Sequence, residues 1–159
     1  MSTLIDIPST AKVWVYQSVR PFNEQEISII TSEMNEFLSS WQSHGSDLKG
    51  YFEVVQGQFI FLAVDESIHS ATGCSIDSSV ATIKKIEQLL GLNLTDKGVI
   101  CYEHNGIIKS SHFTQVKSLI EKEEITPDTT FFDASVTNFE AFQTRWKVAA
   151  KDSWLNRYF

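Results

Sequence analysis

Cysteine, proline and basic residues are all scarce in this sequence. The two cysteines, Cys74 and Cys101, are too few for a disulfide framework and are typical of a protein in a reducing compartment. Lysine and arginine total 13 against 20 aspartates and glutamates, so the formal charge is -7. This balance argues against a nucleic-acid partner, because a phosphate backbone needs neutralising cations. It leaves room for a small anion held by backbone amides.

Long apolar runs are also absent. The longest, Phe59–Val64, is far short of the roughly 20 residues needed to span a membrane. The first ten residues lack the basic region and apolar core of a signal peptide. We therefore expect a cytoplasmic protein that does not associate with membranes, and no motif indicates a cofactor.

What the sequence does contain is the composition of a folded globular protein. Hydrophobic residues make up 42% and charged residues 21% of the 159 residues, which excludes disorder. The chain has no internal repeat and no Pro/Gly/Ser-rich linker. We expect residues 1–159 to form a single domain.

Strand patterns and helix patterns alternate along the chain. Runs rich in β-branched and aromatic residues predict strands at 12–18, 51–56, 59–64, 99–103, 106–109 and 130–136. Apolar residues at helical spacing predict helices at 23–44, 76–90, 113–120 and 137–150. The expected fold is α+β (mixed α/β), with a single layer of largely antiparallel sheet covered by about four helices.

Capping signals set the expected starts of these helices. Asn23 and Glu26 have the spacing of a capping box at the first helix, which we expect to stop at Gly45. The third helix would be capped by Ser110 or Ser111. Thr137 and Glu140 form another such box at the start of the last helix.

The stretch 69–79, HSATGCSIDSS, holds the one nucleophile with a physical rationale. It lies between the apolar run 59–64 and the second predicted helix. A helix N-terminus gathers free N–H groups and positive dipole, which favour anions and thiolates. Cys74 would be the nucleophile, and Gly73 would let a ligand approach the backbone closely.

Several residues are candidate partners of Cys74. His69 or His44 would be the base, and Arg20 would bind an anionic ligand. Ser75 and Asp77 would contribute to the ligand site at the start of the helix. In the alternative interpretation Cys74 is a small buried residue, and Ser75 or Asp77 merely caps the helix.

Two further interpretations use other residues. Asp65, Glu66, His69 and Cys74 have no metal-ligand spacing, so we expect no metal site. The aromatic C-terminal tail, residues 151–159, with the basic residues near it could bind a partner or a second copy of the chain, or fold back over its own domain. A non-catalytic interaction or homo-oligomerising domain is thus the alternative function.

The sequence also resembles a small family of uncharacterised bacterial proteins of the Bacteroidetes type. The resemblance rests on Trp14–Gln17, Arg20–Phe22, His44–Gly45, Leu48–Gly50, Ala63–Glu66, Ala71–Asp77 and Lys151–Trp154 with Arg157. Members often carry the label "ABC transporter ATPase". The present sequence contains no G-x-x-x-x-G-K-[ST] motif, so it does not support that label. The resemblance implies no particular reaction.

Overall fold

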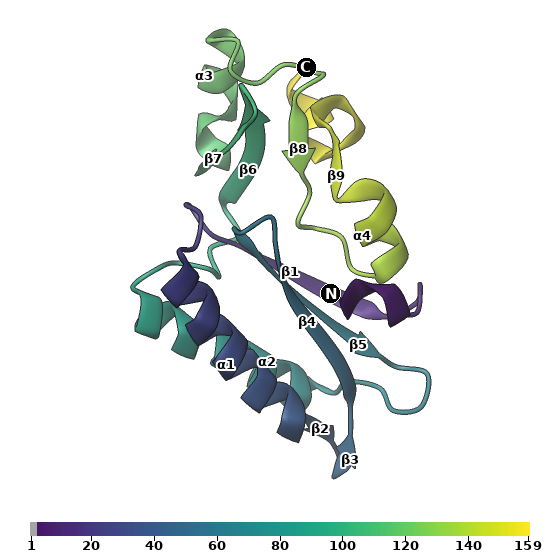
Figure 1. Ribbon diagram of the computed structural model, residues 1–159. Coiled ribbons are helices and arrows are strands. Elements are labelled where there is room, and N and C mark those ends of the chain that lie inside the picture. Colours follow the sequence, from purple (N-terminus) through teal and green to yellow (C-terminus); the bar gives the residue numbers. More distant parts are fainter. Residues whose placement is uncertain (1–2) are drawn as a thin grey trace.

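Two antiparallel sheets, stacked through a shared core, form the body of the computed structural model, which describes residues 3–159 (Figure 1). The first sheet has the order β1 (Lys12–Gln17), β5 (Phe59–Asp65), β4 (Lys49–Val55). The second has the order β7 (Ile107–His112), β6 (Val99–His104), β8 (Thr130–Phe132), β9 (Lys147–Ala149). A short hairpin joins β2 (Gln42–Ser43) to β3 (Ser46–Asp47).

Four α-helices accompany these sheets. They are α1 (Glu24–Ser40), α2 (Gly73–Leu90), α3 (Val116–Glu121) and α4 (Phe139–Arg145). Short 3₁₀ helices lie at Thr3–Asp6, Phe113–Gln115, Ala150–Asp152 and Trp154–Tyr158. None of the described helices combines the length and apolarity needed to cross a membrane. The α+β class, the antiparallel pairing and the four helices are confirmed, while the strands form separate sheets instead of one layer.

Strand β5 is apolar throughout because both of its faces are covered. It lies between β1 and β4, and its residues from Phe59 to Val64 are fully buried. Ile60, Leu62 and Val64 face α1 and α2, which lie together on one side of the first sheet (Figure 1). The alternate residues, Phe59, Phe61 and Ala63, point to the other side, into a core shared with α4 and the second sheet. A uniformly apolar strand is the expected pattern for such a position.

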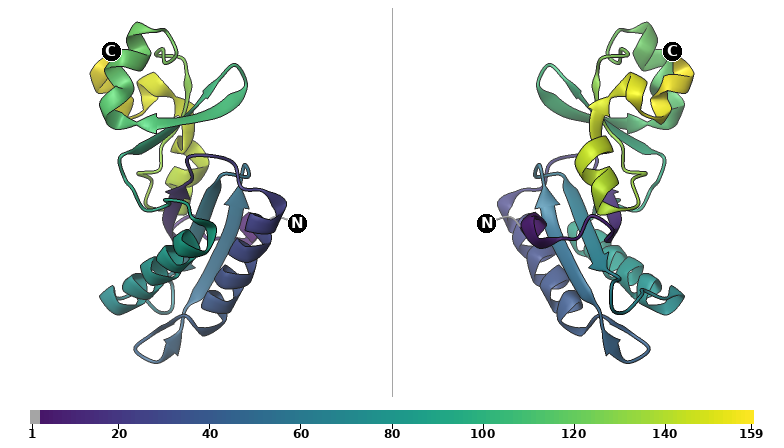
Figure 2. Two further views of the ribbon diagram at one scale, coloured as in Figure 1. Left: turned by 90° about the vertical axis from the view of Figure 1, so that its left-hand side faces the viewer. Right: turned by 90° about the vertical axis from the view of Figure 1, so that its right-hand side faces the viewer.

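Helix α4 fills the space between the two sheets. Its aromatic residues Phe139 and Phe142 contact Phe61 of the first sheet, with ring centroids 6.0 and 4.6 Å away. Trp146, directly after the helix, contacts Phe132 of the second sheet at 5.1 Å. Both turned views in Figure 2 show α4 between the lower and upper parts of the molecule. One core therefore joins the two sheets, a second lies between the first sheet and helices α1 and α2, and a third lies on the outer face of the second sheet.

Tertiary contacts change the predicted end of the first helix. Helix α1 stops at Ser40, five residues before Gly45, and Trp41 takes an extended backbone. The buried Trp41 indole donates a hydrogen bond to the carbonyl oxygen of Ser75 in α2, 2.8 Å away. Trp41 O also accepts a bond from Leu48 N. These non-local bonds replace the predicted glycine stop.

Three boundaries near the C-terminus also differ from the prediction. Strand β7 runs through Ser110 and Ser111, and the His112 side chain caps the following 3₁₀ turn. Strand β8 ends at Phe132, because the Asp133 side chain accepts the amide of Ser135 and closes a turn. In α4 the cap is Asn138, so the predicted role of Thr137 is wrong. The chain beyond Arg145 pairs with β8 as β9 and does not continue the helix.

Candidate functional site

The first turn of α2 is built on a capping box. Thr72 Oγ1 accepts a hydrogen bond from Ser75 N at 3.3 Å, and Ser75 Oγ accepts one from Thr72 N at 2.6 Å. The Ser75 side chain is buried, and its backbone oxygen accepts the Trp41 bond described above. Ser75 is therefore part of the helix cap, as in the alternative interpretation, and its hydroxyl is not directed at a ligand.

Gly73 and Cys74, the first two residues of α2, are open to solvent. Cys74 is exposed, as the ligand-site hypothesis requires, and the alternative in which Cys74 is buried is wrong. Apart from its chain neighbours and the backbone of its own helix, no atom of the described residues lies within 4 Å of where a Cβ on Gly73 would be. Within residues 3–159, no group accepts a hydrogen bond from the amide of either residue. Two N–H groups and a thiol thus face solvent at the positive end of an 18-residue helix.

The second cysteine behaves in the opposite way. Cys101 is fully buried in β6 in the core between the two sheets, as expected for a strand residue. Burial raises the pKa of its thiol to about 12. Cys101 is therefore unreactive in the folded protein, and Cys74 is the accessible thiol.

The two candidate bases lie in loops at the same end of the first sheet as Cys74 (Figure 1). His69 lies in the loop after β5, where it lines a pocket of about 250 Å³ with Lys49 and Asp65. His44 lies in the β2–β3 turn with a positive φ of 51°. In the part of the chain that the structure describes, neither imidazole makes a hydrogen bond to the Cys74 thiol. A general-base role for either histidine stays a prediction.

Asp65 and Glu66 hold the loop that leads to α2. Asp65 Oδ1 accepts the amide of Ser67 at 3.0 Å, and this bond lowers the pKa of Asp65 below its usual value. Glu66 Oε2 accepts the amide of Ala71 at 2.8 Å. No cluster of metal-ligating side chains occurs among residues 3–159. The two carboxylates therefore shape the approach to α2. Asp77, in the second turn, is exposed.

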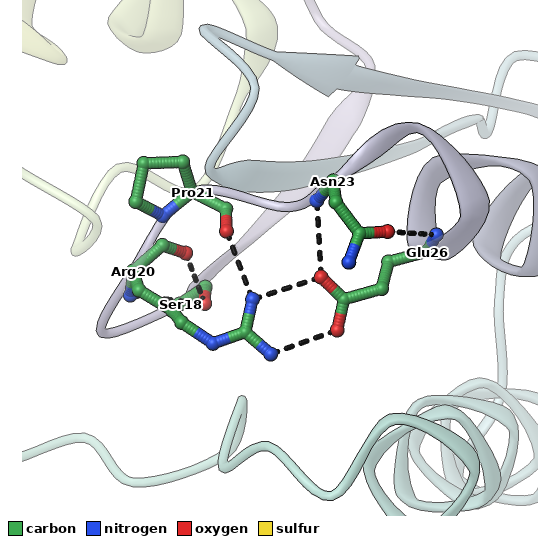
Figure 3. Close-up of polar contacts among 5 residues, drawn as sticks. All are labelled: Ser18, Arg20, Pro21, Asn23 and Glu26. Atoms are coloured by element: carbon green, nitrogen blue, oxygen red, sulfur yellow. Dashed lines mark hydrogen bonds and ion pairs between the residues drawn. The ribbon is translucent and has the colours of Figure 1, made fainter.

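Arg20 is bound within its own part of the chain. Its two terminal nitrogens, Nη1 and Nη2, each donate to a carboxylate oxygen of Glu26 at 2.8 Å, and Nη1 also donates to Pro21 O (Figure 3). Glu26 and Asn23 complete the predicted capping box at α1. The Arg20 guanidinium therefore fastens the end of β1 to the start of α1.

This ion pair also lies far from Cys74. Arg20 pairs with Glu26 in the first turn of α1. The start of α2 lies at the opposite end of α1, where Trp41, the residue after that helix, donates a hydrogen bond to Ser75 O. Helix α1 has 17 residues and is about 25 Å long. The structure therefore separates Arg20 from the Gly73–Cys74 turn, and Arg20 is not the anion partner that the sequence suggested.

The C-terminal tail folds back over its own domain. Leu155 is fully buried in the core on the outer face of the second sheet, and Trp154 and Tyr158 are half-buried against that core. Only the terminal Phe159, 44% exposed, is largely open within the tail's aromatic set. Lys151 is ion-paired with Asp128 at 3.0 Å. The exposed aromatic patch that a docking tail requires is not formed.

A second pocket, of about 300 Å³, was not predicted from the sequence. Residues from three separate segments line it, among them Asp133, Thr137, Arg145, Asp152 and Trp154. No spacing rule links these positions, because the segments meet only through the β8–β9 pairing and the folded-back tail. The sequence signal that points to this pocket is Arg145 at the end of an amphipathic helix, and that signal is weak because solvated arginines are common at such positions.

Comparisons with protein-family models, with curated proteins and with solved structures find no match to this chain.

Proposed function

We propose that this protein binds a small anionic molecule at the first turn of α2, through the backbone amides of Gly73 and Cys74. The observation that carries the proposal is that these two amides and the Cys74 thiol all face solvent without a partner in residues 3–159. Unpaired N–H groups at a helix N-terminus bind anions through hydrogen bonds and through the helix dipole.

A comparison with α1 supports this choice of helix. The first turn of α1 carries its own carboxylates, Glu24 and Glu26, which compensate the positive end of that helix. The first turn of α2 contains no acidic residue. Its positive end therefore has no carboxylate within its own first turn, and an external anion there would be opposed by Glu66, which accepts the Ala71 amide just before the helix, and by Asp77 in the next turn.

The exposed thiol extends what such a site can do. An anion bound on the Gly73 and Cys74 amides would lie beside the Cys74 sulfur, so an anionic electrophile or disulfide would be held at the reacting atom. A free thiol in this position suits a reducing compartment, and we propose a cytoplasmic location. The acidic balance of the chain argues for a small ligand and against a nucleic acid.

Competition between two alkylating reagents tests the anion preference. Iodoacetate is anionic and iodoacetamide is neutral, and both need the thiolate, so the ratio of their rates at Cys74 reports attraction of the anion. We expect this ratio to be about two- to fivefold higher in the folded protein than in the urea-unfolded chain. Mass spectrometry would place the label on Cys74 or Cys101, and folded Cys74→Ser should give none because Cys101 is buried.

Two charge variants separate a local field from the net charge. Asp77 lies three residues after Cys74, so the two side chains are neighbours on the surface of the helix. Asp77→Asn removes a negative charge that repels iodoacetate, and it is expected to raise the iodoacetate-to-iodoacetamide rate ratio further. Glu121→Gln removes one carboxylate from the exposed surface of α3 and should leave the ratio unchanged. An equal ratio in the folded and unfolded chains would overturn the proposal.

A further inference from the structure

The larger pocket brings together charges that the linear sequence keeps apart. Asp133 and Thr137 belong to the connection between β8 and α4, Arg145 ends α4, and Asp152 and Trp154 belong to the C-terminal tail. These segments lie along one side of the second sheet, where α4, β9 and the yellow tail follow one another (Figure 1). The pocket is therefore a product of the folded-back tail.

Arg145 differs from the other two arginines. Arg20 is paired with Glu26, and Arg157 donates from Nε to the carbonyl oxygen of Trp154. The Arg145 guanidinium has neither a hydrogen bond nor an ion pair with any residue from 3 to 159, although two carboxylates line the same pocket. Arg145 and the carboxylates of Asp133 and Asp152 thus line one pocket without an ion pair between them.

The carboxylates keep acceptor capacity for a ligand. Asp133 uses one oxygen, Oδ1, to accept both the amide and the hydroxyl of Ser135, which leaves Oδ2 unbonded among residues 3–159. The Asp152 carboxylate is exposed and accepts no hydrogen bond within the same stretch. An ammonium group needs such acceptors, and a carboxylate needs the guanidinium.

Trp154 supplies an apolar wall beside these charges. Its ring packs edge-on against Phe131, with centroids 5.6 Å apart, and is held at half-exposure by that contact. The indole N–H donates to no acceptor in the described part of the chain, and neither does the Thr137 hydroxyl. The pocket lining therefore includes an aromatic ring held in place by Phe131, and the Arg157 guanidinium lies 5.7 Å from the centroid of the same ring.

We infer that this pocket binds a small zwitterion of the α-amino-acid class. Arg145 would bind the carboxylate of the ligand, Asp152 and Asp133 would bind its ammonium group, and Trp154 would contact its side chain. A plain anion would face two carboxylates, and a plain cation would face the guanidinium, so only a ligand with both charges satisfies both sides. A volume of about 300 Å³ is at the lower limit of ligand pockets and suits a molecule of this size.

Titrations with matched ligands test this inference. The probes are L-leucine and L-phenylalanine, each compared with its deaminated carboxylic acid and its decarboxylated amine. The readout is the assigned indole N–H resonance of Trp154 in the full-length protein. We expect a saturable shift with the amino acids and about tenfold weaker binding, or none, with either analogue. Equal binding of the acids, or no saturable shift at millimolar concentrations of the amino acids, would overturn the inference.

Charge variants assign the contacts. Arg145→Gln and Asp152→Asn are each expected to weaken binding at least about tenfold. Lys84→Gln removes an exposed cation from α2 and is expected to have no effect. A matching loss in Lys84→Gln would show a net-charge effect and contradict the assignment. Cys74→Ser leaves this pocket unaltered, so failure here and failure of the anion site at α2 are distinguishable.

Discussion

Replacement of Phe61 by alanine is expected to lower the free energy of unfolding by about 3–5 kcal/mol. Phe61 is fully buried in the central strand β5 and contacts the aromatic rings of Phe139 and Phe142. These contacts join the first sheet to α4 and so to the second sheet. The cavity would open between the two sheets, where neither sheet can close it without losing contact with α4.

Urea unfolding followed by ¹⁹F NMR of 5-fluorotryptophan would check this result. Trp41 reports the core under α1 and α2, Trp146 the core between the sheets, and Trp154 the outer core. We expect all the signals to share one midpoint and to shift together in Phe61→Ala. Ile68→Ala, at a position 83% exposed, should change stability by less than about 0.5 kcal/mol. A shift confined to Trp146 would contradict a shared core.

Removal of the charge of Glu26 is the second large effect that we expect. Glu26→Gln keeps the side-chain oxygen that accepts the Asn23 amide but loses the ion pair with Arg20. The Glu26 side chain is 10% exposed and that of Arg20 is 47% exposed, so the pair is partly screened by solvent. At neutral pH we expect a loss of about 1 kcal/mol in the free energy of unfolding, because solvent screens the pair and the amide oxygen of the introduced glutamine can still accept a hydrogen bond.

The same ion pair makes this loss depend on pH. Hydrogen bonds from Arg20, together with the backbone bond from Asn23, lower the pKa of Glu26 from the ordinary value of 4.5 to about 2. The folded protein therefore binds this proton less readily than the unfolded chain does. The stabilisation is fully present above pH 4.5 and is lost as the pH falls from 4.5 towards 2. The difference between wild type and Glu26→Gln should shrink over that range.

Urea titrations at pH 7 and at about pH 3 would measure this difference, with the pH window set by linkage. Glu24→Gln is the matched control, because Glu24 lies in the same helical turn and is exposed. Its loss should be a few tenths of a kcal/mol from the helix dipole alone. Arg20→Gln, alone and combined with Glu26→Gln, completes a double-mutant cycle. A loss from Glu26→Gln that is the same at both pH values would contradict the ion-pair explanation.

Local sequence signals predicted those parts of the fold that depend on neighbouring residues. The Asn23–Glu26 capping box forms as expected, because both bonds lie within one helical turn. The turn at Asn105–Gly106 has positive φ at both residues and joins β6 to β7 as predicted.

Non-local contacts decided the features that the sequence did not predict. Arg20 looked free for a ligand because Glu26 is six residues away, beyond a proline and a helix start. The pocket around Arg145 needs β9 to pair with β8 and the tail to return over the second sheet. Neither event has a signal in local spacing.

The sequence by itself determined the cap of α1, the hairpin turns at Gln56–Gly57 and Asn105–Gly106, and the fully apolar central strand, because each depends on short-range hydrogen bonds or on the period of burial. Tertiary structure decided where α1 stops, how the strands divide between two sheets, and which charged side chains pair or face one another across a pocket. Those outcomes depend on which distant segments bury each other. Local residue patterns do not indicate contacts between segments that are far apart in the sequence.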